Sequence, residues 1–177
     1  PTRGALIELL GTPSEGLRAI VQANPPPGAG NRVEGGTRLI DIEDPSLPTT
    51  GSPLFADGQT IELRGAEKGN REVPPASFVV TDTTTLTDFM SFLQDAMGLD
   101  PGIGTNPDGR TPGVTVDPAT GVLSIVGHPG TANDLRIELT DFRVLDANGV
   151  FLRHPFTPTK QASADGESVR TSVVAFD

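Results

Sequence analysis

One amphipathic stretch, residues 84–98, constrains the fold of this chain more than any other part of the sequence. Its apolar side chains recur at the i, i+3, i+4, i+7 and i+11 positions of one helix face: Leu86, Phe89, Met90, Leu93 and Met97. Thr85 and Asp88 form a typical capping pair for a first turn, and Gly98 is a typical residue at a helix end. We therefore predict a helix over about residues 85–97 whose apolar face packs on a β core rather than forming a cofactor groove.

The rest of the chain is typical of strands and turns. Its 21 Gly and 17 Pro are spread among short apolar runs, without the period of a fibrous protein. The predicted fold class is α+β, mostly β, with antiparallel sheets and the single helix packed on a sheet. If Phe89 and Leu93 face that sheet, truncating either to alanine should cost about 2–5 kcal/mol, whereas Gln94→Ala should stay within about 0.5 kcal/mol.

The pattern divides the chain into three segments. Residues 1–53 form an irregular β segment of uncertain affiliation, with strands expected over residues 5–10, 17–23 (or a short helix) and 39–43. Residues 54–142 form an α+β module in the order strand, strand, helix, hairpin, strand. Residues 143–177 form a β hairpin and a returning strand.

Within the module, period-2 alternation predicts strands at residues 61–63, 78–80 and 135–139. The stretch from Asp117 to Gly121 has the chemistry of a hairpin turn, so residues 114–116 should pair with residues 123–125. Asn148-Gly149 predicts a second tight hairpin in the last segment.

Charge and cysteine content argue against several classes of function. The net charge is −10, and only Lys68 and Lys160 among the 13 cationic side chains are lysines, so we expect no nucleic acid partner. No apolar run reaches the roughly 18 residues of a membrane helix, so we expect no membrane partner. The absence of cysteine removes disulfides, thiolate nucleophiles and thiolate metal sites.

We also expect no catalytic, cofactor-binding or metal-binding residues, and no enzyme. His128 and His154 each precede a proline and lack the spacing of a zinc site. Glu62 and Glu138 could be imagined as the carboxylate pair of a glycosidase, but they fall on the outward face of predicted strands. Three Asp, Asn and Gly clusters are interpreted as turns rather than calcium loops: residues 106–109, 117–121 and 146–149.

Several short motifs carry a resemblance to a known family. Residues 166–177 read GESVRTSVVAFD. Five further motifs follow one another along the middle of the chain: DGQTI at 57–61, FVVT at 78–81, TLTDFM at 85–90, GVLSI at 121–125 and GTANDL at 130–135. The closing stretch resembles a segment of the bacterial flagellar hook protein family. The central motifs are similar to an insertion module of long hook proteins and flagellins.

The resemblance implies a structural, non-enzymatic fragment of the flagellar hook, the tubular extracellular joint between motor and filament. On this hypothesis the chain is an outer, surface-exposed portion of a subunit whose axial helices lie elsewhere, and residues 143–177 return toward the subunit core. Copies would meet in a helical polymer, whereas the isolated fragment would be a monomer with Pro1 and Asp177 on the same side. The alternatives are a variable domain of a flagellin or hook-associated protein, or a carbohydrate- or surface-binding adhesin module.

Overall fold

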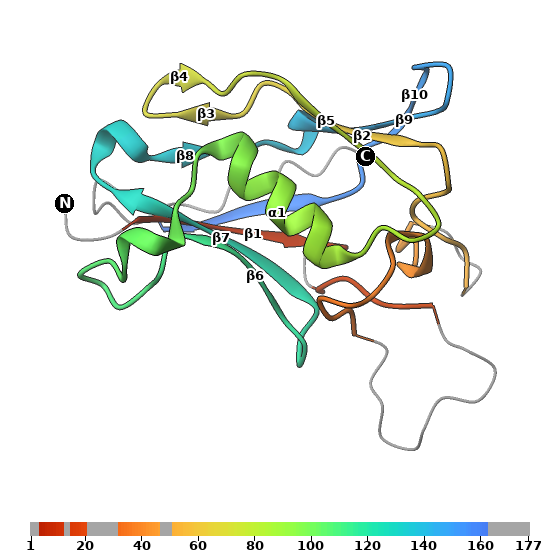
Figure 1. The fold of residues 1–177 in the computed structure, drawn as a ribbon, viewed down its shortest axis with the longest axis horizontal. Coiled ribbons are helices and arrows are strands. Elements are labelled where there is room, and N and C mark those ends of the chain that lie inside the picture. The colour runs from red at the N-terminus through yellow and green to blue at the C-terminus, as the bar shows by residue number, and fades with distance from the viewer. Residues whose placement is uncertain (1–3, 13–14, 21–31, 47–50, 163–177) are drawn as a thin grey trace.

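The computed structural model describes residues 4–12, 15–20, 32–46 and 51–162. In this part of the chain, three antiparallel sheets and one α-helix make up the fold (Figure 1). The predicted class, α+β and mostly β, is confirmed. The closing motif at residues 166–177 and the two chain ends, Pro1 and Asp177, lie outside the described residues.

The first sheet joins strands from the beginning, middle and end of the described chain. Its order is β11-β1-β7-β6, with bounds Thr157–Ala162, Gly4–Leu10, Val122–Pro129 and Gly113–Asp117. Val114 lies opposite Ile125, and Val116 lies opposite Leu123, which confirms the predicted hairpin. This sheet crosses both segment boundaries that the sequence suggested, because β1 pairs with β7 on one side and β11 on the other.

Gly121 closes the turn of that hairpin and shows why the turn needs a glycine. Its φ angle is +72°, and a Cβ atom there would lie 2.1 Å from the backbone oxygen of Leu17. The Leu17 N–H also donates to the Gly121 carbonyl at 2.8 Å. A side chain at this position would therefore strain the backbone and separate the hairpin from residues 16–17.

The second sheet has the order β10-β9-β2-β5, with bounds Phe151–Arg153, Phe142–Leu145, Thr60–Leu63 and Ala76–Val79. The predicted hairpin through Asn148-Gly149 is confirmed, since it joins β9 to β10. The third sheet is small, with the order β4-β3-β8 and the bounds Arg71–Glu72, Glu67–Lys68 and Leu135–Arg136.

The helix α1, Leu86–Met97, has the predicted ends and the predicted buried face. Thr85 Oγ1 accepts from the Asp88 N–H, Asp88 Oδ2 accepts from the Thr85 N–H, and Gly98 adopts a left-handed conformation. In Figure 1 the helix lies between the β1-β7-β6 strands and the β2-β5 strands. Gln94 is not a neutral surface position, because its Oε1 accepts from the Val114 N–H of β6 at 3.0 Å. This hydrogen bond argues against the expected negligible effect of Gln94→Ala.

A connected group of phenylalanine rings fills the space between α1 and the second sheet. Phe89 is fully buried, and its ring centroid lies 5.7 Å from that of Phe78 and 5.9 Å from that of Phe92. Phe142 and Phe156 lie on its other side at 6.5 and 5.7 Å. The helix thus contacts β5, β9 and the residues leading to β11 through one side chain.

The predicted strand at residues 39–43 is wrong, and the one at residues 135–139 is only partly right; local polar contacts explain both. Within residues 39–43 the chain forms a short 3-10 helix, Leu39–Asp41. Leu39 and Ile42, three residues apart, are both buried in the core, and the Arg38 guanidinium pairs with the Asp41 carboxylate at 2.7 Å. Residues 135–139 pair only at Leu135–Arg136 and then turn into a 3-10 helix, Leu139–Asp141.

In the second case, Asp141 Oδ2 accepts from the Glu138 N–H at 2.7 Å. A side chain that satisfies the backbone locally competes with strand pairing. Residues 17–20 also form no regular strand; Arg18 and Ala19 make isolated bridges, to Arg32 and Ile42. The remainder of the expected strand at 17–23 lies outside the described residues.

Candidate functional site

The outward face of the second sheet carries a row of exposed or half-buried side chains. The strand register places Val79, Thr60, Leu145 and Phe151 next to one another across β5, β2, β9 and β10. Directly opposed residues of an antiparallel pair point to the same face. Val79 is 57% and Phe151 42% exposed, and the other two are half-buried. We call these four residues the outer stripe.

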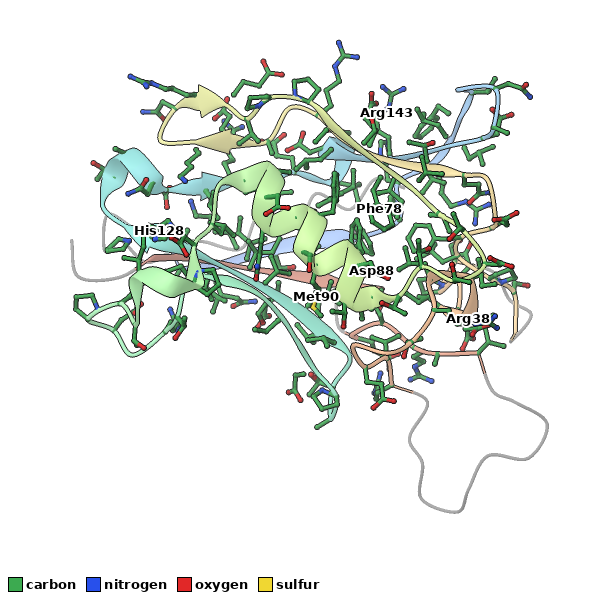
Figure 2. The ribbon with its side chains drawn as sticks, in the orientation of Figure 1. Arg38, Phe78, Asp88, Met90, His128 and Arg143 are labelled. Carbon is green, nitrogen blue, oxygen red and sulfur yellow. The ribbon has the colours of Figure 1, made fainter. Side chains whose placement is uncertain are left out.

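The opposite face of the same strands packs into the core. Ile61 and Val144, which alternate with the stripe residues along β2 and β9, are fully buried. Figure 2 shows the same division, with Phe78 directed toward α1 and Arg143 directed away from it. The stripe is therefore the solvent side of a two-faced sheet, and none of the strands or the helix of the described chain lies over it.

A balanced charge pair lies beside the stripe. Glu62 and Arg143 are cross-strand partners, and Arg143 Nη1 lies 3.2 Å from Glu62 Oε2. The Arg143 guanidinium carbon also lies 5.4 Å from the centre of the Phe151 ring, within the range of a cation–π contact. The arginine is thus held against the stripe by both neighbours, and its charge is balanced by that of Glu62.

The hairpin between β9 and β10 extends the apolar surface. Val150 is 57% and Leu152 40% exposed. Asp146 Oδ1 accepts from the Asn148 and Val150 N–H groups at 2.8 and 2.9 Å, and these hydrogen bonds hold the pKa of Asp146 below its usual value. The turn is therefore well fixed, although its apolar side chains face solvent.

The two histidines make separate backbone contacts. His128 Nε2 accepts from the Asp100 N–H at 3.1 Å, which ties β7 to the residues after α1. His154 Nδ1 contacts the Phe142 carbonyl at 2.8 Å. The described residues contain no group of three or more His, Asp or Glu side chains arranged to hold a metal ion.

Glu62 and Glu138 are not brought together as a catalytic pair. Glu62 on β2 binds Arg143, whereas Glu138 binds Arg136 beside β8. The interpretation of the three polar clusters as turns is confirmed, because their aspartates accept from nearby backbone N–H groups within the same turn: Asp108 from Arg110, Asp117 from Ala119, and Asp146 from Asn148.

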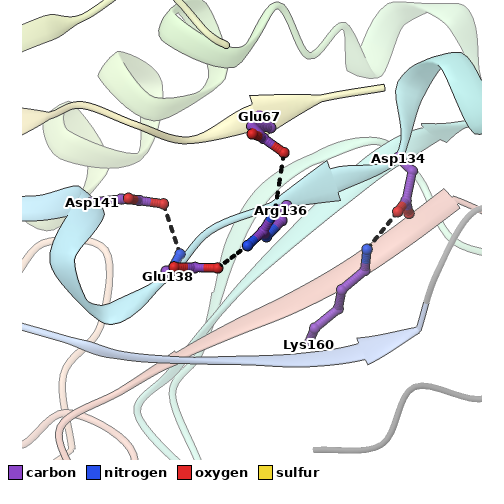
Figure 3. Close-up of polar contacts among 6 residues, drawn as sticks. All are labelled: Glu67, Asp134, Arg136, Glu138, Asp141 and Lys160. Carbon is purple, nitrogen blue, oxygen red and sulfur yellow. Dashed lines mark hydrogen bonds and ion pairs between the residues drawn. The ribbon is translucent and has the colours of Figure 1, made fainter. Parts of the chain in front are cut away.

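A polar cluster joins the small third sheet to its surroundings (Figure 3). Arg136 binds Glu138 and lies 3.4 Å from Glu67, while Lys160 of β11 lies 2.6 Å from Asp134. Burial raises the pKa of Asp141, whose carboxylate accepts the Glu138 N–H. Every cation drawn in this cluster is paired, so the arrangement fixes β8 in place rather than presenting a free charge.

The outer stripe was not predicted from the sequence, although two short apolar runs indicate it. Residues 78–80 and 150–152 are runs of three consecutive apolar residues. In a strand with one buried face, such a run must place at least one apolar side chain toward solvent. Val79 and Phe151 are the middle residues of these runs.

Comparisons of the chain with protein-family models, with curated proteins and with solved structures find no match. Within the described residues, no helix is long and apolar enough to cross a membrane.

Proposed function

We propose that this chain is an outer domain of a bacterial flagellar hook subunit, with a structural and non-enzymatic role on the surface of an extracellular helical polymer. The observation that carries the proposal is the pairing of the first and last described strands. β1 and β11 are antiparallel neighbours, and Leu6 near the start of β1 lies opposite Ala162 at the end of β11.

This pairing is what a domain inserted into a host chain requires. An inserted domain leaves its host and returns to it at nearby points, so its first and last elements must end close together. Here the chain enters the first sheet and leaves it at the same end of two adjacent strands. The expectation for Pro1 and Asp177 themselves lies outside the described residues and stays a prediction.

The positions of the resemblance motifs support the same proposal. The motif at 57–61 forms a turn leading into β2, and the motif at 85–90 contains the cap of α1. The motif at 130–135 forms the 3-10 helix Thr131–Asn133 and enters β8. These three motifs therefore specify turns and a helix cap, which suits a shared structural module better than a shared catalytic site.

Immunoelectron microscopy tests the proposal. Gold-labelled antibodies raised against the 177-residue chain are applied to the bacterium that encodes it, with antibody pre-absorbed on the same chain as the control. We expect gold along the short curved joint between cell body and filament. Labelling along the filament would instead support the flagellin alternative, and labelling of the cell surface without flagella would support the adhesin alternative.

A further inference from the structure

Residues 100–111, which follow α1 and precede β6, are hydrogen-bonded to the rest of the described chain at two places. Both hydrogen bonds lead to consecutive residues near the end of β7. Asn106 Nδ2 donates to the Gly127 carbonyl at 3.0 Å, and the Asp100 N–H donates to Nε2 of His128 at 3.1 Å. Figure 2 shows His128 beside the residues that follow α1. We call residues 100–111 the post-helix segment.

The two hydrogen bonds differ in burial and in chemistry. Asn106 is only 6% exposed, and its amide group does not titrate. Residues 100–105 are all exposed, whereas Leu99 before them is buried. The exposed half of the post-helix segment is therefore fixed at Leu99 and at Asn106, and the contact with His128 holds its first residue against β7.

We propose that His128 is a pH-operated latch, which holds residues 100–105 against β7 at neutral pH and releases them when its imidazole takes up a proton. The inference goes beyond the structural role proposed above and does not depend on it. A backbone N–H can only donate, so Nε2 of His128 accepts with its lone pair and the ring proton lies on Nδ1. A proton added at Nε2 occupies that lone pair and sets two donors against each other. Imidazole groups gain this proton between about pH 8 and pH 5, so the release falls in mild acid.

The other elements around this end of β7 contribute no ion pair to the imidazole among the described residues. β1 and β6 contribute Gly4 and Gly113, which carry no side-chain charge. The turn after β7 contributes Asp134, which is paired with Lys160. The end of α1 is bound by the Lys68 ammonium, which donates to two backbone carbonyls there.

The post-helix segment itself supplies the acidic group that accompanies the latch. Asp100 is the one acidic residue of residues 100–105, and further along Asp108 is paired with Arg110. The Asp100 carboxylate accepts from the Gly102 N–H at 2.8 Å at the start of the 3-10 helix Pro101–Ile103. A carboxylate attracts a neighbouring imidazolium. Protonation of His128 therefore repels the Asp100 N–H and attracts the Asp100 side chain, and this attraction competes with the hydrogen bond that begins the turn.

His154 provides an internal comparison, because its hydrogen bond runs in the opposite direction. The Phe142 carbonyl can only accept, so Nδ1 of His154 donates to it at 2.8 Å. Protonation of His154 adds a hydrogen at Nε2 and leaves this bond in place. Of the two histidines in the chain, His128 alone loses its backbone contact as pH falls.

Nuclear magnetic resonance of the ¹⁵N-labelled chain tests the latch between about pH 7.5 and about pH 5, on either side of imidazole titration. The ring signals of His128 report its protonation, and the Asp100 amide signal reports the hydrogen bond. We expect both signals to shift with the same midpoint. The backbone order parameters of residues 102–105 should fall from about 0.85 toward about 0.6 as the segment is released.

Substitutions at His128 separate the latch from a general effect of acid. His128→Gln keeps an acceptor that does not titrate, so residues 102–105 should stay ordered at both pH values. His128→Lys offers donors alone, so the same residues should be released at both. His154→Gln is the matched control, and its post-helix segment should respond to pH as the native chain does.

Three results would overturn the inference. The first is a His128 ring that titrates while the Asp100 amide and the order parameters stay constant, and the second is a ring that takes up no proton by about pH 5. The third is a His128→Gln chain that loses order in acid as the native chain does. The comparison of His128→Gln with His154→Gln decides the matter even if the lysine variant does not fold.

Discussion

Phe89 is the residue at which the largest loss of stability should follow from a single substitution. Its side chain is fully buried and is in ring contact with four others: Phe78, Phe92, Phe142 and Phe156. Those rings come from α1, the second sheet and the residues preceding β11. Phe89→Ala therefore removes the side chain through which the helix contacts three parts of the core.

The expected cost follows from burial and ring contacts. Truncating a buried phenylalanine costs about 3–5 kcal/mol, and each aromatic pair contributes about 0.5–1.5 kcal/mol beyond its buried area. Because Phe89 has four such neighbours, we expect a loss of about 4–5 kcal/mol. Phe89→Leu keeps most of the apolar volume and should lose about 1–2 kcal/mol, mainly from the ring contacts.

Urea unfolding followed by far-ultraviolet circular dichroism measures these losses, since the chain has no Trp or Tyr for fluorescence. In a domain of this size, each kcal/mol corresponds to about 2–4 °C in Tm, so Phe89→Ala should melt about 8–20 °C lower. Asp95→Ala, on the exposed side of α1, is the matched control and should change stability by less than about 0.5 kcal/mol. Equal effects at Phe89 and Asp95 would refute the central role of this ring.

Three further substitutions test polar contacts, each by the same unfolding assay. Gln94→Ala leaves the buried Val114 N–H without its acceptor and should cost about 1–2 kcal/mol; a loss no larger than that of Asp95→Ala would contradict this. Lys68→Met removes hydrogen bonds to the carbonyls of Met97, the last residue of α1, and of Gly98, which caps it. The change should cost about 1 kcal/mol and lower the hydrogen-exchange protection at that helix end. Burial raises the pKa of Asp141 in the folded state, so ionisation of this carboxyl costs stability as pH rises. The free energy of unfolding of Asp141→Asn, measured relative to the native chain, should therefore increase between about pH 3 and pH 7. A difference that is constant with pH would contradict this.

Elements defined by neighbouring residues could be predicted from the sequence. The helix begins and ends at residues that cap it through hydrogen bonds between groups three residues apart. The hairpin at 114–125 is closed by a turn in which the Asp117 side chain accepts from the Ala119 N–H. The predictions at 39–43 and 135–139 failed because of contacts equally close in sequence: Asp41 pairs with the Arg38 side chain, and Asp141 accepts from the Glu138 N–H. Periodicity alone does not decide between a strand and a 3-10 turn when a carboxylate can bind a side chain or a backbone N–H three residues away.

Pairing between distant strands could not be predicted in this way. The partner of β1 at Leu6 is Ala162, nearly the whole chain away, and no local pattern selects it. The outer stripe depends on this kind of information, since Val79, Thr60, Leu145 and Phe151 become neighbours only once β5, β2, β9 and β10 are ordered in one sheet.

The pairing of β1 with β11 also determines how the domain responds to tension. A pull that separates the ends of these strands near Leu6 and Ala162 acts across the ladder, so the hydrogen bonds break one after another rather than together. β11 lies at the edge of its sheet, whereas β1 is held by β7 on its other side. Peeling should therefore release β11 first and stop at β1, so that this end of the described chain lengthens under load while the phenylalanine core stays folded.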